Sequence, residues 1–201
     1  MFNATLFGTS FITLFVIMDP PGTVPIFLAL TSGRSKRDRR RLAQQAAIVS
    51  FLVISAFAAF GQQILKYLGI TVPALEGSGG LLLLLIALEL LTGRADEPSE
   101  TTDVNVALVP LGTPLLAGPG AIVAVILFVQ QIHAAGDFLA VAAAIVLTHV
   151  VIWLTMRFSV HVIRVIKDSG VTLVTRIAGL LLAAIAVQMV ADAAIAFAKT
   201  A

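Results

Sequence analysis

The sequence predicts an all-α, polytopic membrane protein with six transmembrane helices, arranged as two inverted three-helix repeats with a broken first helix in each half. Three observations lead to this fold: the hydropathy of the chain, the placement of its basic residues, and three pairs of recurring fragments. The 201 residues are 59% hydrophobic and 12% charged, with a mean hydropathy of +1.03. A soluble domain of this length needs far more charge at its surface.

Six apolar segments approach or exceed the ~20 residues that cross a hydrocarbon core of about 30 Å. We expect them over residues 3–31, 42–66, 73–93, 104–131, 138–165 and 173–197. The connections between them are short, so we expect a single transmembrane domain over 1–201. The chain has no cysteine, and its three histidines form no motif at ligand spacing, so we expect no metal and no organic cofactor.

The basic residues predict how these segments are oriented. One face of the membrane receives most of them: Arg34, Lys36, Arg37, Arg39, Arg40, Arg41, Arg94, Arg164, Lys167 and Arg176. The opposite face receives Lys66 and Lys199. By the positive-inside rule the basic face is cytoplasmic and both termini are external. Membrane orientation thus explains the net charge of +2 without a nucleic-acid partner. For the arginine cluster of the first connection, binding of lipid headgroups or of a partner is the alternative interpretation.

Three pairs of fragments recur at offsets of about 97 to 99 residues. DPPGTV at 19–24 matches AGPGAI at 117–122, AAIV at 46–49 recurs within VAAAIVL at 141–147, and GGLLLLLIALEL at 79–90 resembles AGLLLAAIAVQM at 178–189. We therefore predict repeat one over about 1–95 and repeat two over about 104–201, joined by an acidic connecting loop at 94–103. Because each repeat has three segments, the second enters from the opposite face, as in many secondary transporters. Duplication used only for symmetry is the alternative.

The motif DPPGTVP at 19–25 interrupts the first apolar segment. Asp19 and Pro20 each precede a proline and so resist helical geometry, and prolines offer no N–H group. A new helix is expected to begin at Gly22–Thr23, with free N–H groups and the positive end of its dipole available to an anion. Freed backbone groups are costly in lipid, so protein, water or a ligand must satisfy them.

The stretch VPLGTPLLAGPGAI at 109–122 predicts a second interrupted helix. Since the halves are inverted, the two restarted helices are expected to point their amino ends inward from opposite faces and to hold one carboxylate between them. The substrate-binding residues predicted from the two breaks are Asp19, Pro21, Gly22, Thr23, Thr113, Gly118, Pro119 and Gly120. Proline kinks tolerated for helix contact are the alternative.

An intramembrane carboxylate is a functional candidate, since burying an ionised aspartate costs about 2.5–3.5 kcal/mol on insertion scales. Asp19 is expected to hold a substrate ammonium, to carry a coupling proton, or to bond backbone groups at the break. Glu89 is the second candidate for ion coupling, with snorkelling to the interface as the alternative. We expect His149 to be a neutral histidine bonded to a neighbouring helix, and residues 77–80 to form a small-residue face for close helix contact.

At these two motifs the chain resembles the MarC family of inner-membrane proteins, also described as a six-helix neutral amino acid transporter family. DPPGTVPIF and NVALVPLGTPLLAGPGAI carry the resemblance, which extends over essentially the whole chain. Relatives commonly have isoleucine and asparagine where this chain has Pro21 and Thr23, so a hydroxyl replaces a side-chain amide. The resemblance implies transport of small neutral amino acids such as glycine and alanine, coupled to an ion gradient. It also implies a location in the cytoplasmic (inner) membrane of a bacterium or archaeon.

The predicted function is therefore secondary transport, not enzymatic catalysis: alternating access for a small neutral amino acid, with H⁺ or Na⁺ as the coupling ion. The expected partners are the amino acid and membrane lipids, while the oligomeric state, the coupling ion and the direction of net flux are left open. One alternative is an exporter or pore for another small carboxylate solute. The other is an intramembrane enzyme acting on lipid phosphate, which needs a catalytic set that the histidines do not provide.

Overall fold

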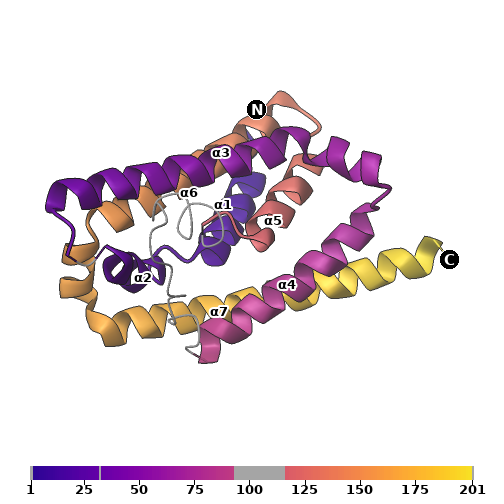
Figure 1. Ribbon diagram of the computed structural model, residues 1–201. Coiled ribbons are helices and arrows are strands. Elements are labelled where there is room, and N and C mark those ends of the chain that lie inside the picture. The colour runs from indigo at the N-terminus through magenta and orange to yellow at the C-terminus, as the bar shows by residue number, and fades with distance from the viewer. Residues whose placement is uncertain (1, 32, 93–115, 201) are drawn as a thin grey trace.

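The computed structural model describes residues 2–31, 33–92 and 116–200, and these residues form seven α-helices (Figure 1). In chain order they are α1 (Ala4–Met18), α2 (Thr23–Leu30), α3 (Lys36–Leu68), α4 (Val72–Thr92), α5 (Pro119–Gln130), α6 (Ala135–Arg157) and α7 (Ser159–Thr200). The predicted all-α class is confirmed for this part of the chain. The acidic loop at 94–103 and the candidate residue Thr113 lie outside the described residues.

Four helices are long and apolar enough to cross a membrane: Lys36–Leu68, Val72–Thr92, Ala135–Arg157 and Ser169–Lys199. They fall in the second, third, fifth and sixth predicted segments. Two shorter apolar helices, Ala4–Met18 and Gly120–Gln130, fall in the first and fourth segments, where the sequence predicts interruptions. Large apolar side chains also cover the outer faces, including Leu52, Leu85 and Leu180, which are 60%, 58% and 63% exposed. Helices that are apolar all round are typical of a multi-pass membrane protein.

The predicted end of the fifth segment, at residue 165, is wrong. α6 ends at Arg157, because Phe158 leaves helical geometry with φ −104° and ψ 17°. α7 then bends at Lys167, whose φ of 60° and ψ of 165° separate a short first part from the long apolar second part. Residues 151–165 contain neither glycine nor proline, so nothing in their pattern marks the end of α6. The correction places Arg157 at a helix end.

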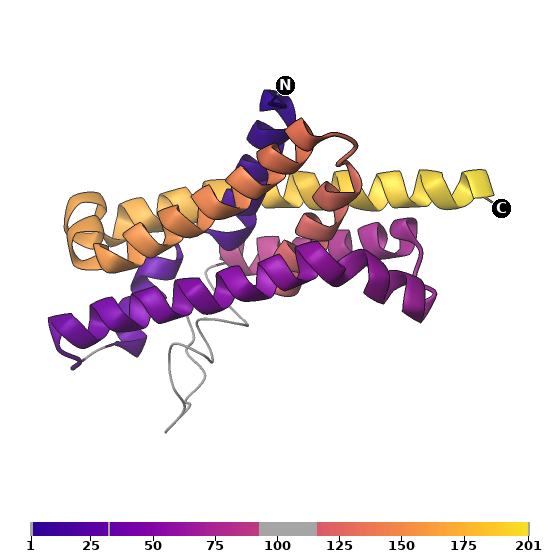
Figure 2. The ribbon, with the colours of Figure 1, turned by 90° about the horizontal axis from the view of Figure 1, so that it is seen from above.

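The helices form two antiparallel pairs with shorter helices between them. Figures 1 and 2 show α3 lying along α6 on one side and α4 lying along α7 on the other, with α1, α2 and α5 between the pairs. α5 fits closely between two glycines: a Cβ on Gly61 of α3 would lie 2.8 Å from Ile126 Cδ1, and one on Gly79 of α4 would lie 3.0 Å from Val123 Cβ. Both glycines let α5 approach its neighbours closely.

α4 and α7 touch through one glycine from each helix. A Cβ on Gly80 would lie 2.8 Å from the Ala186 carbonyl oxygen, and a Cβ on Gly179 would lie 3.2 Å from the Ala87 carbonyl oxygen. The contacts are reciprocal, because Gly179 and Ala186 occupy the places of Gly80 and Ala87 in the recurring fragment. The close helix contact predicted at residues 77–80 is therefore confirmed.

We predict that Gly80→Ala destabilises the protein. The added methyl would meet a backbone carbonyl that cannot turn aside, and overpacking of this kind costs about 1–3 kcal/mol. The matched control is Gly8→Ala in α1, where a Cβ would have nothing within 4 Å and where alanine favours the helix. Thermal unfolding midpoints of the purified variants in one detergent test this, and equal midpoints would contradict the close contact.

Candidate functional site

The first apolar segment is interrupted where its sequence predicts. α1 ends at Met18, and Asp19 follows in the left-handed conformation with φ 37° and ψ 69°. This conformation is uncommon for a residue with a side chain, and aspartate is among those that tolerate it best. α2 begins at Thr23, so the predicted restart of the helix at Gly22–Thr23 is confirmed.

Carbonyl groups of the break accept hydrogen bonds from the first residues of α2. The Thr23 N–H donates to the Asp19 carbonyl at 3.0 Å, and the Val24 N–H donates to the Pro21 carbonyl at 3.1 Å. The Thr23 hydroxyl donates to the Pro20 carbonyl at 2.7 Å. The prediction of free N–H groups at the start of α2 is thus wrong for residues 23 and 24, because the turn brings the carbonyls of the break within their reach.

The Asp19 carboxylate is buried, with the residue 6% exposed, and neither oxygen has a hydrogen-bond partner among the described residues. It folds back over Gly22, where an added Cβ would overlap its Oδ2 and would lie 3.1 Å from Thr175 Oγ1 of α7. The Gly22 backbone and the Thr175 hydroxyl face the carboxylate without reaching hydrogen-bond geometry. Gly22 is required here because a side chain would displace the carboxylate.

Thr175 Oγ1 is also buried and without a hydrogen-bond partner in the described part of the chain. A buried polar atom left unpaired costs about 1–3 kcal/mol, and more when it is charged. Two such groups facing each other therefore indicate a site that a ligand, ion or proton completes. The sequence did not single out Thr175, since a threonine in an apolar helix usually bonds its own backbone and only the approach of α2 gives it a neighbour.

The second break presents N–H donors, whereas the first presents a carboxylate. α5 begins at Pro119 after the N-cap Gly118, which has no side chain to accept a hydrogen bond. The Ile122 N–H donates to the Gly118 carbonyl at 3.2 Å, whereas the N–H groups of Gly120 and Ala121 have no acceptor within the helix. Free N–H groups and the helix dipole make this end attractive to an anion, as the sequence predicts for it.

The two breaks lie close together. A Cβ on Gly120 would lie 3.5 Å from Cγ2 of Ile17, which precedes Asp19 by two residues, and 3.4 Å from Leu83 Cγ of α4. Gly120 is buried, and its lack of a side chain brings α5 against α1 and α4. A role for Gly118, Pro119 and Gly120 in binding substrate stays a prediction.

The remaining predicted residues divide into two groups. Pro21 is half-buried and Thr23 is 3% exposed, so both belong to the first break. Glu89 is exposed on α4, and its carbonyl lies 3.4 Å from the hydroxyl of Thr92, the last residue of the helix. This position favours snorkelling of Glu89 to the interface over ion coupling.

His149 lies apart from the breaks, between α6 and α3. Its Nδ1 is 2.8 Å from the Ile145 carbonyl oxygen, and its Nε2 is 3.2 Å from Ser50 Oγ. A carbonyl only accepts, so Nδ1 carries the hydrogen, and a neutral ring then accepts the Ser50 hydroxyl at Nε2. The Phe51 ring meets the imidazole edge-on at 5.4 Å between centroids. The predicted bond from His149 to a neighbouring helix is confirmed.

Comparison with known proteins extends over nearly the whole chain. Residues 4–197 match the family described as MarC family integral membrane protein. The chain belongs to this family. It is 37% identical to UPF0056 membrane protein MJ1677 of Methanocaldococcus jannaschii, over 92% of this chain and 94% of the relative.

This MarC family protein also has bacterial relatives. It is 33% identical to UPF0056 membrane protein YvbG of Bacillus subtilis over 90% of each chain, and 31% identical to UPF0056 membrane protein YhcE of Escherichia coli over 94% of this chain and 92% of that protein. No solved structure matches the chain. The resemblance drawn from the two motifs is confirmed at the level of the family.

We predict that Asp19→Asn leaves the unfolding temperature of this MarC family protein unchanged or raises it. The substitution removes a buried charge without removing any hydrogen bond of the carboxylate seen in the structure. Asp137→Asn is the matched control and is expected to destabilise, because the Asp137 carboxylate accepts from the Asn3 side chain at 2.8 Å and from two backbone N–H groups at 3.0 and 3.1 Å. Thermal unfolding in detergent measures both, and a large loss for Asp19→Asn alone would show that Asp19 is structural.

Proposed function

We propose that this protein is a secondary transporter of small neutral amino acids, such as glycine and alanine, working by alternating access with H⁺ or Na⁺ as the coupling ion. The observation that carries the proposal is the Asp19 carboxylate, which is buried at a helix break inside a membrane protein and has no partner among the described residues. Intramembrane carboxylates of this kind mark substrate and ion pathways.

The opposite polarity of the two breaks fits a zwitterion. The first break presents a carboxylate and a hydroxyl, from Asp19 and Thr175, which suit an ammonium group or a cation. The second presents the N–H groups of Gly120 and Ala121, which have no acceptor within α5 and suit a carboxylate. An amino acid carries both charged groups on one small molecule. This assignment replaces the prediction that both helix ends hold one carboxylate, since the start of α2 is already satisfied by its own break.

Reciprocal contacts support two inverted repeats in one transmembrane domain. Gly80 meets Ala186 while Gly179 meets Ala87, which is how equivalent residues meet across a two-fold axis. The bond between Ser50 and His149 joins α3 to α6 in the other antiparallel pair. A two-fold axis through both helix pairs would invert one half of the chain relative to the other. Both termini would then lie on the external face of the cytoplasmic membrane.

The two halves differ at their breaks, which supports alternating access. Gly120 meets Leu83, so the equivalent neighbour of Gly22 would be Leu182 of α7. Gly22 instead faces Thr175, seven residues earlier, a displacement of about 10 Å along a helix. We propose that in the opposite-facing state Gly22 meets Leu182, while Gly120 moves away from Leu83. Rocking of one repeat against the other requires such an exchange.

The test is uptake of labelled alanine into proteoliposomes under an imposed proton or sodium gradient. We predict saturable, gradient-driven uptake by the unmodified chain and at least a tenfold loss for Asp19→Asn, because an amide neither holds an ammonium by charge nor carries a proton. The matched control is Glu89→Gln, another exchange of a carboxylate for an amide, which is expected to keep uptake near that of the unmodified chain since Glu89 is exposed.

Equal uptake by Asp19→Asn and the unmodified chain, with both proteins folded, would refute the role of Asp19. Conductance without saturation would indicate a pore. If folded protein moves no alanine, alanine is removed as a substrate, and counterflow of other small carboxylates decides between an exporter and a protein that does not transport.

A further inference from the structure

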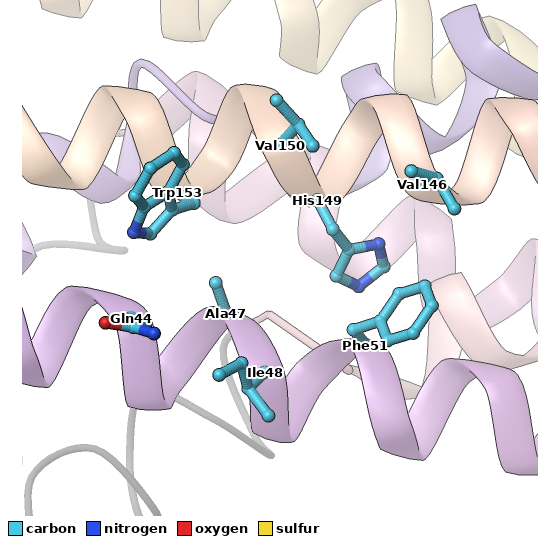
Figure 3. Close-up of a pocket in the computed structure, with 8 residues that line it drawn as sticks. All are labelled: Gln44, Ala47, Ile48, Phe51, Val146, His149, Val150 and Trp153. Carbon is cyan, nitrogen blue, oxygen red and sulfur yellow. The ribbon is translucent and has the colours of Figure 1, made fainter.

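A groove between α3 and α6 is open on the outside of the helix pair. It has a volume of about 330 Å³ and is lined by Gln44, Ala47, Ile48, Phe51, Val146, His149, Val150 and Trp153 (Figure 3). Ile48, Val146 and Val150 are 47%, 48% and 40% exposed, so the groove is a surface feature and not part of the Asp19 site. Its wall is almost entirely apolar.

One end of the groove is basic. Because α3 and α6 are antiparallel, the amino end of α3 and the carboxyl end of α6 lie together, beyond Gln44 and Trp153 (Figure 3). Arg37 and Arg41 lie seven and three residues before Gln44, on the same helix face, and both are exposed. Arg157 lies one turn after Trp153, with its guanidinium carbon 5.2 Å from the indole centroid. The nearby carboxylate of Asp38 accepts from the Ser35 hydroxyl at 2.6 Å.

The groove also holds a buried donor at its basic end. The Trp153 indole N–H is inaccessible to solvent and has no acceptor among the described residues. Trp153 and Gln44 lie at the same end of the groove, and Arg157 stacks on the indole. A tryptophan beside basic residues at the end of a membrane helix is typical of headgroup level.

The groove together with Arg41, which lies beyond its end at Gln44, spans about half a bilayer. Ten residues separate Arg41 from Phe51, which is about 15 Å along α3. That is about half of a 30 Å hydrocarbon core. An acyl chain with its headgroup at Arg41 would therefore run along the groove to the depth of Phe51.

We infer that the α3–α6 groove binds an anionic phospholipid, with an acyl chain between the two helices and the phosphate between Arg41 and Arg157. Basic pockets between membrane helices on the cytoplasmic side are suited to such headgroups. A second copy of the chain fits less well, because a two-fold dimer through this face would bring two basic ends together. The inference is independent of the proposed transport function.

The test counts bound lipid by native mass spectrometry of the full chain, titrated with phosphatidylglycerol or with phosphatidylcholine of the same acyl chains. We expect phosphatidylglycerol to bind with a clear preference and Arg41→Gln/Arg157→Gln to weaken its retention on the order of tenfold, since both variants remove a surface cation. The matched control is Lys66→Gln/Lys199→Gln, which removes two exposed charges away from the groove and is expected to bind as the unmodified chain does.

A second pair of variants tests the apolar part of the groove. Ile48→Trp fills the groove and is expected to lower lipid occupancy severalfold, whereas Leu85→Trp on the exposed face of α4 leaves it unchanged. Equal binding of the two lipids, or equal losses for the arginine and lysine pairs, would overturn the inference. A change of oligomeric mass in Ile48→Trp with unchanged lipid occupancy would also overturn it, because a second copy would then occupy the groove.

Discussion

A hydrocarbon core offers no hydrogen-bond partner to a broken helix, so a break inside a membrane must satisfy its backbone within the protein. Here the residues of the first break do so themselves. The N–H groups of Thr23 and Val24 reach back to the carbonyls of Asp19 and Pro21, and the Thr23 hydroxyl covers Pro20. The first N–H groups of α2 are thereby paired, whereas the side chain of Asp19 has no hydrogen-bond partner among the described residues.

Glycines determine how closely the other helices surround this break. Gly22 leaves room for the Asp19 carboxylate, and Gly120 brings the start of α5 against Ile17. Gly80 and Gly179 hold α4 and α7 together, which fixes the height at which Thr175 faces the carboxylate. The polar site therefore depends on helix contacts made with almost no side-chain volume, as is common in membranes.

The buried helix breaks and the open α3–α6 groove differ in where their polar groups lie. At the breaks, polar groups are buried and incomplete, and this is the basis of the proposed transport site. Along α3 and α6 the apolar groove is open and the charge lies at its end, where a lipid headgroup would be found. One surface suits a small polar solute that enters and leaves, and the other suits a component of the membrane itself.

Much of the architecture follows from the sequence alone. Hydropathy predicts a multi-pass membrane protein, the motif at residues 19–25 predicts where the first helix stops and restarts, and small residues at 77–80 predict a close helix contact. Proline geometry and helix-scale hydropathy are local properties, which is why a single sequence reveals them. The end of α6 at Arg157 was not predictable, because residues 151–165 contain no glycine or proline that marks it.

The partners of each polar group were decided only by the tertiary structure. Asp19 faces Thr175, more than 150 residues away, and His149 meets Ser50 across two helices. The predicted anion site at α2 is closed by its own carbonyls, whereas the N–H groups of Gly120 and Ala121 at the start of α5 have no backbone acceptor among the described residues. The sequence determined which groups would be buried in the membrane, and helix contact decided which of them are left unpaired, because pairing depends on distances between segments that the chain order does not specify.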